Sequence, residues 1–296
     1  MPWCKRAFGL RREVFASVPE GDTVALSARR LHTALAGKVL TRSDLRVPRL
    51  ATVDLRGRRV ESVVARGKHL LIRVGADATL HTHYGMEGSW HLYRPGERWK
   101  GPDHQVRAIL ATQEVVAVGF RLKTLELLER THEDDAVGHL GPDLLGPDWN
   151  ARVAVDNIRA HPDRTLGDVL LDQTVLAGAG NVYRSEVLFL RGLHPLSTVS
   201  EVDDIEAVVA LLKRLFEVNR DRGDQVTTGD TRPGRGRWVY GRLGEPCRRC
   251  GTPIERNYIL GPAGQRMAYW CPSCQPAPVH SSEASEDDRT TAGQAE

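Results

Sequence analysis

Four of the five cysteines form two closely spaced pairs, Cys247 with Cys250 and Cys271 with Cys274, and 20 residues separate the pairs. Two C-x2-C pairs at about this separation are typical of a zinc site with four thiolate ligands. Such a site leaves no coordination position for water, so we expect one structural Zn²⁺. Two disulfides are the alternative, and zinc is favoured because nothing else in the sequence indicates export. Cys4 is left over.

A run of positive charge surrounds the first cysteine pair. Residues 232–256 contain seven arginines against Glu245 and Glu255, whereas the whole chain of 296 residues has a net charge of only +3. Trp238 and Tyr240 lie within the run. A charge run is often a solvated face, but arginines and aromatic residues beside a zinc hairpin are typical of nucleic-acid binding, which we favour.

A small-residue turn, Ala177-Gly-Ala-Gly180, lies between two helical patterns, and Asn181 begins the second pattern. Free backbone N–H groups at the start of a helix can bind phosphate, so we expect this turn to face nucleic acid. His81 and His83 alternate on one predicted strand. Because no acid or cysteine partner is evident nearby, we interpret both as strand or DNA-facing residues and not as metal ligands.

The elements that must position these residues change in type along the chain. Apolar residues at helical spacing predict a helix over 23–36 with Thr23 as its cap. Short β-rich runs follow and indicate a β-sandwich or barrel; they cover 38–45, 60–65, 69–74, 78–84, 106–111 and 114–120. Helical patterns then predict a capping box at Thr165-x-x-Asp168 and helices over 181–191 and 201–217.

Composition excludes several classes of protein. Hydrophobic residues make up 41% of the chain and charged residues 27%, which is typical of globular proteins. No apolar run approaches the ~20 residues that span a bilayer, so we expect no membrane partner. Arg11, Arg12 and Glu13 interrupt any signal-peptide stretch near the start. Residues 277–296 are rich in Ser, Ala, Thr and acids, which predicts a disordered acidic tail.

Several short motifs occur in an order that resembles the formamidopyrimidine-DNA glycosylase/endonuclease VIII family, on the endonuclease VIII side and of the actinobacterial type. They run over about residues 19–276, and it is their combination and order that is specific. The motifs are Pro19-Glu-Gly-Asp-Thr23, Arg66-Gly-Lys-His-Leu-Leu71, His83-Tyr-Gly-Met-Glu-Gly88, His139-Leu-Gly-Pro142, Leu170-Leu-Asp-Gln173, Ala177-Gly-Ala-Gly-Asn181 and Tyr269-Trp-Cys-Pro-Ser-Cys-Gln275.

The resemblance implies an α+β, multi-domain fold: an N-terminal β-sandwich with an N-terminal helix, then a helix-two-turn-helix domain with a four-cysteine zinc ribbon hairpin. It divides the chain into a leader that does not belong to the native protein (1–18), a catalytic β-sandwich domain (19–140), a linker (141–150), a helical DNA-binding domain (151–243), a zinc finger (244–276) and the acidic tail (277–296).

The resemblance also assigns roles to single residues. Pro19 would be the nucleophile that forms a Schiff base with the sugar, Glu20 the general acid/base, and Lys68 a contact to the phosphate and the opening sugar. Three further residues would contact DNA: Met86 as a wedge beside the everted nucleotide, Asn181 at the flanking phosphates and Arg266 on the zinc hairpin. Two positions depart from the family pattern. Thr23 stands where many members have a glutamate, four positions after the proline, and Glu87 and Gly88 after Met86 differ from the endonuclease VIII pattern. These two differences leave the preferred base open.

The resemblance therefore implies a bifunctional DNA glycosylase and abasic-site lyase of base-excision repair, with oxidised pyrimidines favoured, β,δ-elimination and damaged DNA as the partner. An 8-oxoguanine or formamidopyrimidine glycosylase is one alternative. A damaged-DNA-binding protein without catalysis is the other, if Pro19 is not freed. We expect a monomer in the bacterial cytoplasm, associated with the nucleoid.

The position of Pro19 conflicts with its implied role. An internal proline nitrogen belongs to an amide and cannot form a Schiff base, so Pro19 must become the first residue. Val18 precedes it, and GTG encodes valine within a gene but methionine where translation starts in bacteria. We therefore expect translation to begin at Val18, with removal of the initiator freeing Pro19.

Overall fold

The computed structural model describes residues 18–261 and 264–278. Residues 1–17, with Cys4, and 279–296 lie outside the described residues, so the expected leader and acidic tail are not tested except at Val18 and at Ala277 and Pro278. The domain division stays a prediction. None of the described helices is long and apolar enough to cross a membrane.

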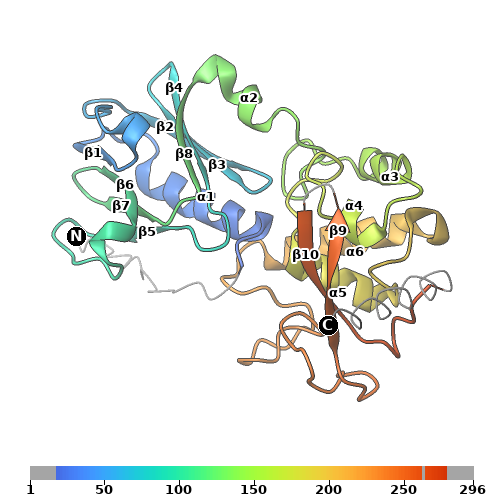
Figure 1. Ribbon diagram of the computed structural model, residues 1–296. Coiled ribbons are helices and arrows are strands. Elements are labelled where there is room, and N and C mark those ends of the chain that lie inside the picture. Colours follow the sequence, from blue (N-terminus) through green and yellow to red (C-terminus); the bar gives the residue numbers. More distant parts are fainter. Residues whose placement is uncertain (1–17, 262–263, 279–296) are drawn as a thin grey trace, which may run out of the picture.

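The first half contains two four-stranded antiparallel sheets (Figure 1). One has the order β1-β6-β7-β5 and the other β2-β3-β4-β8. The strands are β1 (Arg42–Leu45), β2 (Val60–Arg66), β3 (His69–Val74), β4 (Ala78–His83), β5 (Ser89–Tyr93), β6 (Val106–Ala111), β7 (Val116–Phe120) and β8 (Thr124–Glu129). One apolar core draws on both sheets and on helix α1 (Gly21–Leu35). Separate sheets identify the sandwich, and not a barrel, as the architecture.

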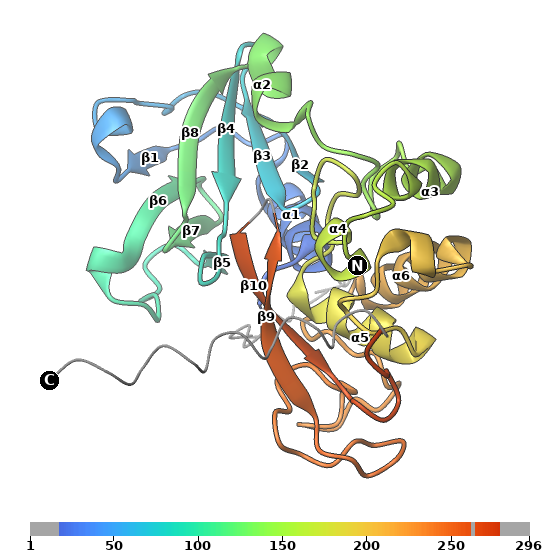
Figure 2. The ribbon, with the colours of Figure 1, turned by 45° about the vertical axis from the view of Figure 1, so that its right-hand side comes forward.

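The second half is helical and has a core of its own. Its helices are α3 (Ala151–Arg159), α4 (Leu166–Val169), α5 (Asn181–Arg191) and α6 (Ile205–Asn219), and the short α2 (Glu133–Val137) precedes them. Single 3₁₀ turns lie at Pro48–Leu50, Asp103–Gln105, Arg130–His132 and Val199–Glu201. The antiparallel hairpin of β9 (Glu255–Gly261) and β10 (Gly264–Trp270) lies against α5 in the helical half (Figures 1 and 2).

Most predicted elements are confirmed, and the differences have local causes. Helix α1 begins at Gly21, so Thr23 lies inside it and is not its cap. The run 38–45 yields only an isolated bridge at Val39 and the short β1. Strands β5 and β8 were not predicted because their apolar residues do not stand out from their charged and polar neighbours. The capping box is half right: Thr165 accepts from the N–H of Asp168, but the Asp168 carboxylate pairs with Arg164 instead.

Candidate active site and nucleic-acid interface

Glu20 connects the start of the described chain to the start of helix α5. Its carboxylate accepts hydrogen bonds from the backbone N–H groups of Gly180 at 2.8 Å and Val182 at 2.7 Å. The side chain is buried, with 1% of its surface exposed. The partial positive charge of the helix start stabilises this carboxylate as an anion. Glu20 and the start of α5 therefore form one site, although at least 160 positions separate them in the sequence.

Glycines make this approach possible. A Cβ atom at Gly180 would lie 2.6 Å from the carboxyl carbon of Glu20, and a Cβ at Gly21 would lie 2.8 Å from the Cα of Gly178. The N–H of Gly21 donates to the carbonyl of Gly178 at 2.9 Å, and Gly178 adopts a φ of +108° that other residues rarely adopt. Glu20 and Gly21 therefore pack directly against the Ala177–Gly180 turn.

The contact with Glu20 shows that the predicted role of this turn in phosphate binding needs correction. The turn was expected to offer free N–H groups to phosphate, but those of Gly180 and Val182 are bonded to Glu20. What remains available near the turn is the side chain of Asn181. Its Oδ1 is buried and has no hydrogen-bond partner among the described residues, which is the kind of atom that a ligand or ordered water satisfies.

Burial shifts the pKa values of Glu20 and Lys68, and the charge of each group opposes the shift of the other. Burial raises the pKa of Glu20 to about 7, although the charge of Lys68 and the two backbone bonds oppose the rise. Burial lowers the pKa of Lys68, while the charge of Glu20 opposes that shift. A carboxyl group with a pKa near neutrality can donate and accept a proton under physiological conditions.

Lys68 follows Gly67 in the tight turn that joins β2 and β3. Gly67 has a φ of +55°, and its N–H donates to the carboxylate of Asp143 at 2.7 Å. Asp143 is itself buried. The turn that carries Lys68 is thus fixed to the segment between the two halves of the chain.

Two arginines add positive charge near Lys68. The charges of Arg266 on β10 and Arg184 on α5 both lower the pKa of Lys68 further. Arg184 is fully buried, and its guanidinium donates to the carbonyl oxygens of Gly167 at 3.2 Å and of Met267. Sequence reasoning missed Arg184. It attaches the zinc hairpin to α5 and so places Arg266 beside the site.

A buried polar network lies on the other side of Pro19 and was also missed. Asp22 accepts a hydrogen bond from the hydroxyl of Tyr183 at 2.7 Å, and the amide nitrogen of Gln225 lies 3.5 Å from its carboxylate. The same amide nitrogen donates to the carbonyl of Val18 at 3.1 Å. Burial raises the pKa of Asp22. No sequence pattern links Gln225 to residue 22, because 203 positions separate them.

Met86 lies in the turn between β4 and β5, and 67% of its surface is exposed. Met86 is therefore not a core residue of a strand. Arg107, Arg121 and Lys123 line a hollow of about 300 Å³ together with Met86. Glu87 also lines the hollow, so three cations and one acid surround this exposed apolar side chain, which suits insertion between the bases of a duplex.

The histidines form a larger cluster than expected. The Nδ1 of His69 lies 2.8 Å from the Nε2 of His81, and the rings of His83 and His139 pack against His69 at centroid distances of 5.0 and 6.5 Å. Burial lowers the pKa of His69 to about 3 and that of His83 to about 4. The prediction that no acid lies near is wrong, since His81 Nδ1 is 3.2 Å from Glu126.

Two of the seven arginines in the run, Arg242 and Arg248, bond to backbone carbonyls within the protein. Arg242 is buried and bonds to Glu245 and to the carbonyls of Trp238 and Pro246, and Arg248 bonds to two further carbonyls. Trp238 stacks on Phe189. The segment is held by the fully buried Glu186, whose carboxylate accepts the N–H groups of residues 238, 239 and 240. The expected nucleic-acid footprint is therefore partly a structural network.

The four predicted cysteine ligands come together. Their sulfur atoms all lie within 4.8 Å of one another, and they are the one group of this kind among the described residues. The Sγ atoms are 4.0 Å apart between Cys247 and Cys274 and 3.4 Å between Cys250 and Cys271, so no disulfide joins them. Tetrahedral zinc with Zn–S bonds of about 2.3 Å needs sulfur atoms about 3.8 Å apart. The donor set fits one structural Zn²⁺.

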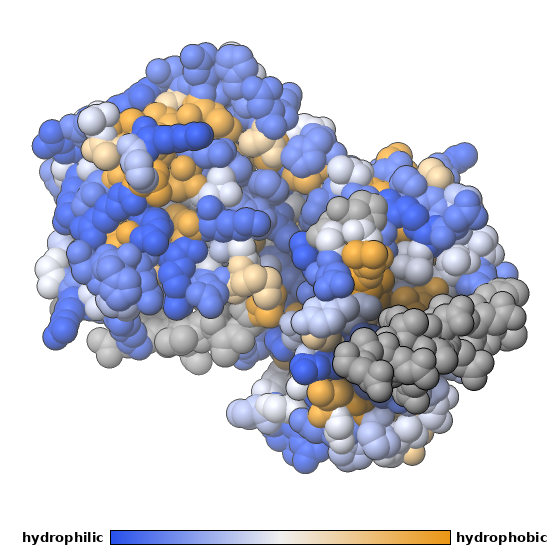
Figure 3. Space-filling view, viewed as in Figure 1, coloured by the Kyte–Doolittle hydropathy of each residue, from blue (hydrophilic) through white to orange (hydrophobic). Residues whose placement is uncertain are grey.

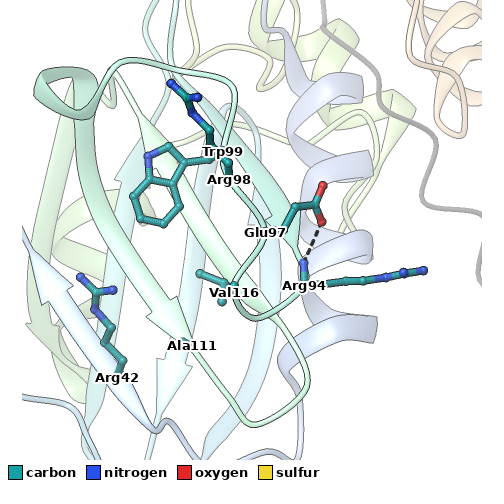
Figure 4. Close-up of a pocket in the computed structure, with 8 residues that line it drawn as sticks. Arg42, Arg94, Glu97, Arg98, Trp99, Ala111 and Val116 are labelled. Carbon is teal, nitrogen blue, oxygen red and sulfur yellow. Dashed lines mark hydrogen bonds between the residues drawn. The ribbon is translucent and has the colours of Figure 1, made fainter.

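Figure 3 shows that hydrophilic residues dominate the face seen there. A separate cavity of about 370 Å³ lies at the sheet that contains β1 and β7, with Arg42 and Trp99 among its lining residues (Figure 4). It contains none of the predicted site residues.

Three family models match the chain. They are the formamidopyrimidine-DNA glycosylase N-terminal domain at residues 18–123, the formamidopyrimidine-DNA glycosylase H2TH domain at 140–225, and the zinc finger found in FPG and IleRS at 244–277. Among solved structures, the chain is similar to MutM in complex with carbocyclic 8-oxo-G containing DNA. That likeness has a TM-score of 0.73 at 23% identity and covers 88% of this chain and 100% of that one.

Curated relatives are more similar in sequence. "Probable endonuclease 8 2" of Streptomyces coelicolor is 54% identical over 88% of this chain and 95% of its own length. The "DNA-(apurinic or apyrimidinic site) lyase Nei2" of Mycolicibacterium smegmatis is 51% identical over 88% of this chain and 100% of its own length. "Endonuclease 8" of Escherichia coli O9:H4 is 32% identical over 87% of this chain and 100% of its own length.

Proposed function

The chain belongs to the formamidopyrimidine-DNA glycosylase/endonuclease VIII family, and from this premise we propose that it is a DNA glycosylase and abasic-site lyase that excises oxidised bases, with oxidised pyrimidines preferred. Its partner is damaged DNA, which it meets as a monomer in the bacterial cytoplasm, at the nucleoid. The observation that carries the proposal is the buried carboxyl group of Glu20, next to Pro19 and under the charge of Lys68, with a pKa of about 7.

In the proposed reaction Pro19 is the nucleophile. A terminal proline is a secondary amine, and a terminal amine titrates about two units below a lysine, so more of it is free base at neutral pH. Its lone pair attacks C1′ of the damaged nucleotide, and the base leaves with the electrons of its bond to C1′ and takes up the proton that the amine loses. Glu20 protonates the ring oxygen O4′ as the sugar opens and the iminium forms. Its pKa of about 7 supplies the acid form that this step needs.

The iminium then acidifies the neighbouring C2′–H bond, and loss of that proton expels the 3′ phosphate in β-elimination. A second elimination removes the 5′ phosphate. Lys68 meets the phosphate and the opening sugar, and its cation stabilises the leaving phosphate. Met86 fills the gap left by the everted nucleotide, while Asn181 and Arg266 bind the flanking backbone. Four thiolates hold the zinc, which keeps the hairpin that carries Arg266 folded.

Catalysis requires a free nitrogen on Pro19, and we propose that translation starts at Val18. One observation supports this: the N-terminal family model begins at residue 18.

Borohydride trapping tests the proposal. Protein that starts at Val18 should become covalently joined to an oligonucleotide that carries 5-hydroxyuracil, whereas protein that keeps residues 1–17 should not. Pro19→Gly should slow trapping, and Glu20→Gln should slow it about 100-fold. Intact-mass measurement of the native protein provides the control, because a species that retains residues 1–17 and still cleaves lesions would overturn the proposal.

The same assay separates the alternatives. Faster excision of 8-oxoguanine than of 5-hydroxyuracil or thymine glycol would identify an 8-oxoguanine-type enzyme. Tight binding to a lesion duplex without trapping by the Val18-start protein would identify a binding protein without catalysis.

A further inference from the structure

The side-chain amide of Gln225 lies beside Pro19 and has no part in the reaction described above. Gln225 follows α6 and is 2% exposed. Its Nε2 donates to the carbonyl oxygen of Val18 at 3.1 Å and lies 3.5 Å from a carboxylate oxygen of Asp22. A buried amide with two such partners is held in one place.

The orientation of this amide is determined by its neighbours. Its Oε1 lies 3.3 Å from Nη2 of Arg237, and a guanidinium can only donate. Asp22 is fixed in turn by the hydroxyl of Tyr183 at 2.7 Å. The oxygen of Gln225 therefore faces Arg237, and its NH2 group faces Asp22 and Val18.

Val18 marks a position that the substrate takes in the proposed reaction. Its carbonyl carbon is bonded to the nitrogen of Pro19, the atom that would attack C1′. A carbon bonded to that nitrogen occupies the place of C1′ in the covalent adduct, and an oxygen on that carbon occupies the place of an oxygen on C1′. This oxygen is O1′ when the substrate is an abasic aldehyde, and O4′ when the sugar ring is intact.

We propose that Gln225 contacts the substrate and that its Nε2–H group donates a hydrogen bond to the oxygen on C1′ when Pro19 attacks. The inference rests on the proposed function, because it requires Pro19 to be the nucleophile. A preorganised donor aimed at an oxygen that gains negative charge stabilises the transition state, as an oxyanion hole does.

The step on an abasic aldehyde balances as follows. The lone pair of Pro19 forms the N–C1′ bond, and the π electrons of C1′=O1′ move onto O1′, where the Gln225 amide donates. The proton that the amine loses and one proton from Glu20 both reach O1′, which leaves as water as the nitrogen lone pair forms the iminium. Glu20 ends as a carboxylate. Gln225 keeps its protons throughout.

Two substitutions remove the donor in different ways, and both are tested in protein that starts at Val18. Gln225→Met keeps the length of the side chain, and Gln225→Glu keeps its shape but replaces the NH2 by an acceptor. Gln113→Met is the matched control, because Gln113 is an exposed turn residue of the sandwich. The measurements are the single-turnover rate of borohydride trapping on an abasic duplex, the dissociation constant for undamaged duplex, and thermal unfolding.

We expect trapping by both Gln225 variants to be about 100–1000-fold slower than by the parent, in line with the loss of one oxyanion donor. Affinity for undamaged duplex should stay within about twofold, and Gln113→Met should match the parent. If either Gln225 variant folds and traps at the parent rate, the inference is wrong and the proposed function stands. If the parent itself does not trap, the proposed function fails and this inference fails with it.

Discussion

Glu20 and Val182 lie 162 positions apart in the sequence, yet a hydrogen bond of 2.7 Å joins the carboxylate of the first to the backbone N–H of the second. This bond places the catalytic acid of the proposed reaction at the positive end of helix α5. It also couples the sandwich to the helical half of the chain. The predictions below follow from this coupling and from the groups around it.

The rate of base excision should depend on two groups near neutral pH. Glu20 acts in its protonated form, and its pKa is about 7, so the rate should fall as the pH rises through 7. Pro19 acts as free base, so its contribution rises toward a pH of about 8. We expect a bell-shaped profile in single-turnover assays of Val18-start protein. Residual excision by Glu20→Gln, about 100-fold slower, should lack the falling limb, and a limb that survives would assign it to another group.

Gly180→Ala should disable the site without touching a catalytic side chain. The new Cβ would lie 2.6 Å from the carboxyl carbon of Glu20, so one of the two must move. We expect excision to slow by about 10–100-fold and stability to fall by about 1–3 kcal/mol. Gly236→Ala is the matched control, since its Cβ would meet nothing closer than 3.4 Å. If the two variants behave equally in kinetics and urea unfolding, close packing of Glu20 against Gly180 does not matter for activity or stability, and the prediction is wrong.

Removal of zinc should unfold the hairpin and leave the sandwich folded. Cys250→Ser should reduce the metal content from one zinc per chain to well below one and weaken duplex binding at least tenfold, because Arg266 loses its support. The control is Ser273→Ala, an exposed residue within the second cysteine pair, which should keep the zinc. Metal analysis and fluorescence anisotropy report the two effects. Full zinc content in Cys250→Ser would contradict the four-thiolate site.

Met86→Ala should impair eversion of the damaged nucleotide from the duplex and leave the stability of the protein almost unchanged. The side chain is 67% exposed, so stability should change by no more than about 0.5 kcal/mol. Excision from duplex DNA should slow about tenfold, and cleavage of a single-stranded abasic site should change little, because no stack needs filling there. Leu260→Ala, at 76% exposure on the zinc hairpin, is the comparison. An equal loss on both substrates would argue against a wedge.

Arg266→Ala should weaken duplex binding in a salt-dependent way. Loss of one phosphate contact should reduce the slope of log affinity against log salt by about one. The pKa of Lys68 should rise, because the charge of Arg266 contributes to its lowering. Arg152, whose side chain is 91% exposed on α3, provides the control substitution to alanine. An unchanged salt slope in Arg266→Ala would exclude the phosphate contact.

The sequence determined the features that depend on short spacing. Each cysteine pair, each short motif and each predicted strand or helix lies within its own short window, and the order of the motifs carried the resemblance that implied roles for Glu20 and Lys68. Such windows fix local chemistry and local backbone geometry, which is why the Cys247–Cys250 and Cys271–Cys274 pairs could be assigned without any structure.

Tertiary structure decided which groups meet. The start of α5 is bonded to Glu20 and is not free for phosphate. Two arginines of the run, Arg242 and Arg248, bond to carbonyls within the protein, and Glu126 reaches His81 from another strand. The pKa of Glu20 and the contact of Gln225 with Val18 likewise depend on burial and on residues more than 150 positions away. Burial and long-range contacts arise only when the chain packs, so no local pattern encodes them.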